Sequence, residues 1–130
     1  MSTNALEGAP ESAVVAISET PDLCIVIASF RNSRKNRNIE KDDRVSVVVG
    51  WSKDESKTLQ IEGHAEIVVG EERERLEVAH CKKNPPSLKY KNDVRQEYIK
   101  IKPSWVRYSD FSVDPQEVWE VVEHPRIDTD

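Results

Sequence analysis

Apolar and polar residues alternate along several stretches of the chain in the pattern typical of β-strands. The clearest alternation runs over residues 58–69, where one face carries Leu59, Ile61, Gly63, Ala65 and Ile67. Further strands are predicted over 12–18, 23–29, 44–51 and 98–108. The last of these contains Pro103, where a bulge or an edge position is expected because proline cannot donate to the ladder.

Helix signals occur at two places between these strands. Ser33 is expected to be the N-cap of a short helix over 33–41. A second helix is predicted over 71–82, because Glu71 and Glu72 would match the helix dipole in its first turn. Near the C-terminus, the apolar residues of 118–122 are expected to dock as a single helical turn, with 123–130 loose.

The order of these elements predicts a mainly β fold. Strands joined mostly by short links favour an antiparallel sheet that closes on itself into a β-barrel with flanking helices. Residues 1–112 are expected to form this domain, and 113–130 a partly ordered acidic tail. The strand over 44–51 is almost continuously apolar, so we expect cover on both of its faces, by the barrel core and by a helix or a second subunit.

Composition narrows the functional classes. The 130 residues suffice for one domain, and a net charge of −5 argues against non-specific binding of nucleic acid. No apolar stretch is long enough to span a bilayer, and the first residues lack the features of a signal peptide, so a cytoplasmic protein is expected. Cys24 and Cys81 are expected to be reduced and buried.

A basic turn stands out in this acidic chain. It carries Arg31, Arg34, Lys35 and Arg37 between two strongly apolar strands, close to the predicted helix start. A phosphate there would satisfy the free N–H groups of the first turn, the Ser33 hydroxyl and the nearby cations together. The alternative is a solvated basic turn, paired with the acidic residues at 40, 42 and 43.

Three ordered blocks resemble a known family. They are 33–51, which opens with Ser-Arg-Lys, then 60–65 (Gln-Ile-Glu-Gly-His-Ala), and 102–111, which contains Trp-Val-Arg-Tyr-Ser-Asp-Phe. Together they resemble the pyridoxamine 5′-phosphate oxidase-like FMN-binding split-barrel family, and most closely its short members described as general stress proteins. The resemblance implies an antiparallel split barrel of six strands or nearly so, with FMN as cofactor. It implies that Ser33, Arg34 and Lys35 bind the FMN phosphate, and that the hydroxyl of Ser29 reaches the flavin.

The same resemblance implies contacts with the flavin ring. The backbone of Val14 and Val15 would lie along the isoalloxazine, and the strand from 58 would present a polar side chain to it. Thr58 takes this position in the simplest register, whereas Gln60 is favoured slightly because an amide both donates and accepts hydrogen bonds.

The family also implies a homodimer with the flavin site at its interface. Trp105 and Arg107 would then come from the partner subunit. The alternative for these two residues is structural, with Trp105 in the core and Arg107 in a surface ion pair.

The chain departs from the true oxidases in three respects. Ala13 and Ser18 stand where those enzymes carry basic residues, so weaker phosphate binding is expected. Nothing after Tyr108 matches the Arg-x-His element that grips the substrate phosphate, so pyridoxamine phosphate is not the expected substrate. Only residues 1–6 precede the Gly-x-Pro turn, too few for the family's first helix and a full first strand.

The resemblance implies an FMN-dependent oxidoreductase acting on an unidentified small substrate. No catalytic residue is assigned, although His64 and His80 are possible acid–base groups, and no metal site is expected. The alternative is a stress protein that binds flavin without turnover, or that binds another anionic ligand such as a deazaflavin, a haem or a nucleotide.

Overall fold

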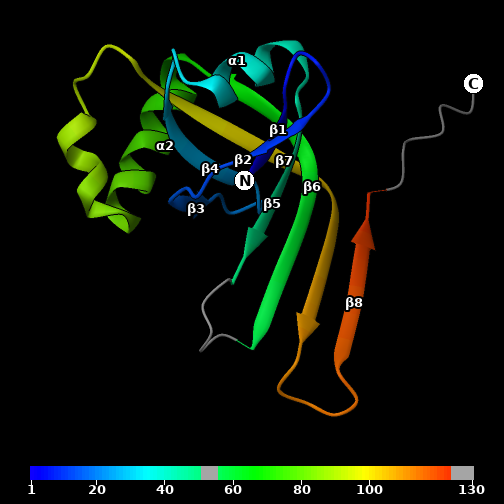
Figure 1. Cartoon of the computed structure of the whole chain (residues 1–130). Helices are drawn as coiled ribbons and strands as arrows, with labels where there is room; N and C mark the ends of the chain where they lie inside the picture. The colour runs from blue at the N-terminus through cyan, green and yellow to red at the C-terminus, as the bar shows by residue number, and fades with distance from the viewer. Residues whose placement is uncertain (51–55, 124–130) are drawn as a thin grey trace, which may run out of the picture.

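An antiparallel sheet with helices at one end forms the framework of the protein. The computed structural model describes residues 1–50 and 56–123 (Figure 1). Its strands are β1 (Ser2–Asn4), β2 (Pro10–Ser12), β3 (Ile17–Glu19), β4 (Ile25–Phe30), β5 (Arg44–Val49), β6 (Lys57–Val68), β7 (Gln96–Asp110) and β8 (Glu117–Val122). Its helices are α1 (Arg34–Lys41) and α2 (Gly70–Lys83), followed by the 3₁₀-helix η1 (Pro85–Tyr90).

The sheet is larger than predicted and does not close. Across the described residues its order is β2-β1-β5-β6-β7-β4-β3, and β8 pairs with β7 outside this path, which makes eight strands rather than six. The mainly β, antiparallel split-barrel prediction is confirmed, but the expectation of a sheet that closes on itself is wrong. The two ends of the path, β2 and β3, pair only with β1 and β4.

The segment over 10–19 explains the open sheet. One continuous strand was predicted over 12–18, whereas the structure has β2 at its start and β3 at its end, on opposite ends of the sheet. Residues 13–16 cross between these ends without joining a strand. The backbone N–H and C=O groups of Val14, Val15 and Ala16 make no hydrogen bond to any described residue.

Strand β7 changes partner along its length. Its first half pairs with β4 as far as Ile101, and its second half pairs with β8 from Trp105 onward. Between them the register against β6 shifts, because Gly63 lies opposite Pro103 while Glu62 lies opposite Trp105. The predicted irregularity at Pro103 is therefore confirmed as a bulge.

The core lies on one face of the sheet. The inward face predicted for β6 is confirmed, since Ile61 and Ala65 are buried and Leu59 and Ile67 pack against the core. The buried cluster consists of Ile25, Ile27, Ile39, Val45, Val47, Ile61, Ala65, Ile99 and Ile101. A smaller cluster of Val26, Val68 and Tyr98, with Leu76 of α2, forms under the second helix.

Three further expectations are overturned or left open by the structure. The outer face of β5 is open, with Val48 57% exposed, so no helix of the described chain covers it, and cover by a second subunit stays a prediction. The segment 118–122 lies in β8 rather than in a helical turn, because it pairs with the free edge of β7. Trp51, predicted to end a strand, and 124–130, predicted to be loose, lie outside the described residues.

The structure tests the predicted helices and cysteines but not the predicted domain boundary. Helices α1 and α2 are confirmed, and both cysteines are free and buried as expected. The division of the chain at residue 112 stays a prediction. In the described part of the chain, no helix has the length and apolarity needed to cross a membrane.

Candidate functional site

The basic turn between β4 and α1 is built as a capped helix start. Ser33 has an extended backbone and accepts a hydrogen bond from the Asn36 N–H at 3.3 Å, which confirms it as the N-cap. The N–H groups of Arg34 and Lys35 have no carbonyl partner within the helix, because they belong to its first turn. The turn therefore presents two free amide donors next to the Ser33 hydroxyl.

A cavity of about 330 Å³ opens beside this turn. Five residues predicted for the cofactor line it together: Val14, Val15, Ser29, Ser33 and Lys35. The hydroxyl oxygens of Ser29 and Ser33 lie 3.0 Å apart, so the end of β4 and the start of α1 act as one polar corner. This juxtaposition of residues from three separate segments is the main finding at the site.

The same cavity has a wall that the site prediction missed. It is lined additionally by Ala16, Ala28, Phe30, His80, Ser87, Tyr90 and Gln96. The Phe30 and Tyr90 rings meet edge to face, with 5.4 Å between their centroids. No element was predicted over 87–95. The 3₁₀-helix η1, which brings Tyr90 next to β4, has no periodic pattern of apolar residues that would indicate it.

Arg34 points away from the cavity. Its side chain is 79% exposed, and its Nε donates to Glu11 Oε2 at 2.9 Å. Asn38 donates to the other oxygen of Glu11 at 2.9 Å, and the two contacts, that of Asn38 first, hold the pKa of this carboxyl below its usual value. Arg34 thus has a carboxylate partner in β2, whereas its neighbour Lys35 lines the cavity. Lys35 also lines a smaller cavity of about 220 Å³, which it shares with Arg34.

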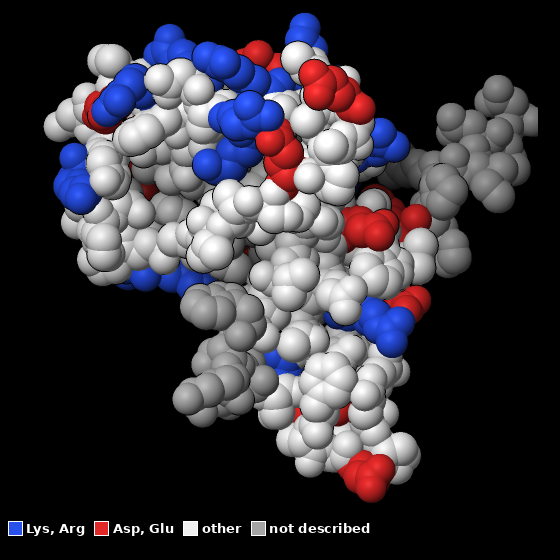
Figure 2. Space-filling view, viewed as in Figure 1, with Lys and Arg blue, Asp and Glu red and all other residues white. Residues whose placement is uncertain are grey.

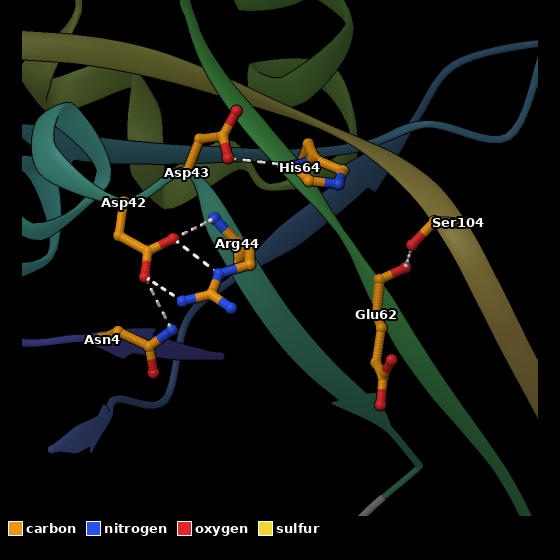
Figure 3. Close-up of polar contacts among 7 residues, drawn as sticks. All are labelled: Asn4, Asp42, Asp43, Arg44, Glu62, His64 and Ser104. Carbon is orange, nitrogen blue, oxygen red and sulfur yellow. Dashed lines mark hydrogen bonds and ion pairs between the residues drawn. The ribbon is translucent and has the colours of Figure 1, made fainter. Parts of the chain in front are cut away.

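The pairing predicted for a merely solvated basic turn is not found. Asp42 is engaged by the guanidinium of Arg44 at 2.7 Å, and Asp43 by His64 at 2.9 Å (Figure 3). The Arg44 contact holds the pKa of Asp42 well below its usual range. Figure 2 shows Lys and Arg side chains gathered over the end of the molecule where α1 lies. An excess of positive charge therefore remains near the cavity.

A second cavity of about 330 Å³ lies on the outer side of the sheet, at the residues drawn in Figure 3. Arg44, Glu62, His64 and Ser104 line it. Two of these exposed residues are paired with carboxylates outside the lining, Arg44 with Asp42 and His64 with Asp43. The expectation that His64 is a surface residue is confirmed, and this cavity has no excess charge to attract an ion.

The other four predicted residues lie elsewhere in the chain. Thr58 is half-buried and Gln60 exposed on β6, and neither lines the cavity beside α1. Arg107 lies opposite Gln60 and donates to Glu120 of β8 at 3.0 Å, and the indole N–H of Trp105 lies 3.4 Å from the same carboxylate. Within one chain these residues form a separate group on β6 and β7, next to β8. Arg107 makes the ion pair of the structural alternative, but Trp105 is half-buried and does not belong to the core as that alternative expected.

The comparison with protein families decides the relationship. The sequence matches the model of the family described as pyridoxamine 5′-phosphate oxidase over residues 1–110. The chain belongs to this family. The expected kinship is confirmed, and the fold agrees with it. A search of curated proteins finds no match.

Solved structures of similar proteins share the fold. The general stress protein 26 of Bacillus anthracis is 27% identical, with a TM-score of 0.65 over 92% of this chain and 85% of that one. An FMN-binding, pyridoxamine 5′-phosphate oxidase-related protein from Nostoc punctiforme is 10% identical, with a TM-score of 0.68 over 95% and 85%. A heme binding protein from Mycobacterium smegmatis is 18% identical, with a TM-score of 0.80 over 93% of this chain, which spans 50% of that protein.

Proposed function

We propose that this pyridoxamine 5′-phosphate oxidase family member binds FMN in the cavity beside α1. The observation that carries the proposal is the convergence of Ser29, Ser33 and Lys35 with the unpaired backbone of Val14 and Val15 around one space. The chain also belongs to a family with FMN-binding members, which favours FMN as the cofactor. The proposal therefore stands on both family and geometry.

The residues present suit a phosphate at one end of the cavity. Lys35 would supply the positive charge, Ser29 and Ser33 the hydroxyls, and the first turn of α1 two amide N–H groups. Charge-assisted hydrogen bonds of this kind are the stronger class. Ala13 and Ser18 add no cation, and Arg34 is held by Glu11, so we expect fewer ionic contacts to the phosphate than in the true oxidases.

The backbone over 14–16 suits a planar ring. Its N–H and C=O groups have no partner among the described residues, and a buried ligand with its own donors and acceptors would satisfy them. Bound FMN would supply hydride or single-electron transfer. The protein's own residues would bind and orient the cofactor and limit the access of water, which requires few reactive side chains.

We further propose that the active form is a homodimer acting as an FMN-dependent oxidoreductase on a small molecule. Thr58, Gln60, Trp105 and Arg107 do not line the cavity of their own chain, so a partner subunit would have to bring them to the flavin. Arg107 would then have to exchange or share its contact with Glu120.

A second candidate ligand is haem, because the Mycobacterium smegmatis structure is named a heme binding protein and has the same fold.

A first experiment distinguishes FMN from haem. The protein as purified is denatured, and any released chromophore is identified by mass. FMN supports the proposal, whereas haem, a deazaflavin or a nucleotide would overturn it. A flavoprotein that is bleached by a nicotinamide donor and recovers in air would be an oxidoreductase, and one that stays oxidised would be a binding protein.

A pair of adjacent substitutions tests the site. We expect Lys35→Ala to weaken FMN binding by roughly thirtyfold, equivalent to about 2 kcal/mol for one lost charge-assisted contact, as measured by quenching of flavin fluorescence. Arg34→Ala is the matched control, because it removes an adjacent positive charge that is already paired with Glu11. We expect this control to weaken binding by less than threefold. Equal losses in both variants would mean that only the general charge of the turn matters.

A further inference from the structure

His80 is a buried polar residue with one side open to the cavity. It lies in the last turn of α2, is 1% exposed, and yet lines the same space as Lys35. Its Nδ1 lies 2.8 Å from the Ser18 hydroxyl oxygen, and its ring meets Tyr98 edge to face with 5.8 Å between centroids. These contacts from β3 and β7 fix the orientation of the ring.

The Ser18 hydroxyl determines where the ring carries its proton. Ser18 is 3% exposed, and its Oγ has His80 Nδ1 as its one partner among the described residues. A buried hydroxyl hydrogen without an acceptor is costly, so Ser18 donates and Nδ1 accepts. Burial, and secondarily the charge of Lys83, lower the pKa of His80, which keeps the ring neutral near pH 7. A neutral ring with Nδ1 as acceptor carries its hydrogen on Nε2.

The Nε2–H group is left without a protein partner. It makes no hydrogen bond to any described residue, and Nε2 is not sealed from the cavity, since Glu77 Oε2 is the one fully enclosed atom without a partner in the described part. A donor with accessible surface and no protein partner can be used by a ligand. An oriented neutral donor that faces a cavity therefore indicates a ligand acceptor atom.

The other residues of the cavity indicate which part of the ligand would carry the acceptor atom for His80 Nε2–H. Lys35, Ser33 and the α1 N-terminus already provide for an anionic group. The rest of the lining consists mostly of small or apolar side chains and aromatic rings, among them Val15, Ala28 and Tyr90, with the polar Ser87 and Gln96. An apolar wall with a neutral donor suits a flat, uncharged ring that carries a carbonyl oxygen or an unprotonated nitrogen.

We propose that His80, positioned by Ser18, recognises the flavin ring by donating a hydrogen bond from Nε2–H to one of its acceptor atoms. This inference rests on the proposed function, since it concerns the same cavity. It assigns the two ends of the site to different parts of the molecule, with Lys35 for the phosphate and His80 for the ring. The Ser18–His80 pair would thereby act as a specificity-determining unit.

The test compares FMN with riboflavin, which has the same ring without the phosphate. His80→Asn keeps an acceptor near the Nδ1 position for Ser18 but removes the donor that faces the cavity, whereas His80→Gln can place an amide donor near the Nε2 position. We expect His80→Asn to weaken both ligands by about the same factor, roughly fivefold to tenfold, and His80→Gln to recover most of the loss. Lys35→Ala should instead weaken FMN far more than riboflavin. Thermal unfolding of each variant checks that it is folded.

A second measurement does not depend on substitution. In protein with ¹⁵N-labelled histidine, the Nε2–H resonance of His80 should move on addition of riboflavin and indicate a directly protonated Nε2. Unchanged affinity of His80→Asn for both ligands, or a loss confined to FMN, would overturn the assignment to the ring while leaving FMN binding intact. Failure of the wild-type protein to bind either flavin would overturn the proposed function and this inference together.

Discussion

At the scale of single residues, neighbours in space decide what a side chain does. Arg34 and Lys35 are adjacent and both positively charged, but Arg34 pairs with Glu11, whereas Lys35 is one of the residues that line the cavity. His80 and His64 differ in the same way, since one is enclosed under the sheet and the other lies exposed beside Asp43. Residue type alone would have given each pair the same role.

Which residue fits at position 63 also depends on a neighbour from another strand. A Cβ at this position would lie 2.4 Å from the carbonyl oxygen of Lys102, at the bulge opposite Pro103. We expect Gly63→Ala to destabilise the protein by about 2 kcal/mol, because the clash is with main chain that cannot move without disturbing the β6–β7 pairing. Chemical denaturation measures the change.

Glu66→Ala is the control for Gly63→Ala, since it alters an exposed position of the same strand. It should change the free energy of unfolding by less than about 0.5 kcal/mol. Equal stability of Gly63→Ala and wild type would mean that the close approach to Lys102 is relieved easily.

At the scale of elements, the start of α1 combines a structural and a proposed binding role. Ser33 caps the helix through the Asn36 N–H, and its hydroxyl also faces the cavity beside Ser29. The crossing segment over 13–16 has a similar double character. It connects two ends of the sheet, and the backbone groups of Val14, Val15 and Ala16 have no partner among the described residues.

Substitutions at Ser33 can separate the two roles. Asp is also a good N-cap and suits the helix dipole, so Ser33→Asp should keep the midpoint of thermal unfolding close to that of wild type. Its negative charge should nevertheless weaken FMN binding more than tenfold by repelling the phosphate. Ser33→Ala should show the reverse balance, with stability lower by about 1 kcal/mol and a smaller loss of affinity. Wild-type FMN affinity in Ser33→Asp would place the phosphate elsewhere.

At the scale of the whole molecule, the residues predicted for the flavin lie in two separate groups. The cavity residues gather around α1, β4 and α2, whereas the β6–β8 group lies apart from them. Strand β5 also leaves Val48 exposed on its outer face, and every residue of β8 is exposed. The proposed homodimer would account for both observations.

Val48→Glu tests this assembly. Because the side chain is 57% exposed in the single chain, we expect the subunit to fold normally. A charge buried in a subunit interface is costly, so the variant should be monomeric by solution scattering and bind FMN more weakly. Val78→Glu, at another exposed position on α2, is the control and should remain dimeric. A dimeric Val48→Glu variant with normal FMN affinity would exclude the outer face of β5 from the interface.

The sequence by itself determined several of the local elements and predicted five of the residues that line the cavity. Strand β6, helix α2 and the Ser33 cap followed from periodicity, charge placement and cap chemistry, because these act between residues close in the chain. Ser33 and Lys35 were predicted because charge is concentrated where a helix begins, and Ser29 was predicted from the family resemblance.

The tertiary structure alone decided the rest. It divided the 12–18 strand between two ends of the sheet, sent 117–122 to the free edge of β7, turned Arg34 towards Glu11, and brought His80 of α2 to Ser18 of β3. Each of these outcomes depends on which distant segments meet, and hydrogen-bond partners that are supplied across the fold leave no periodic pattern in the sequence.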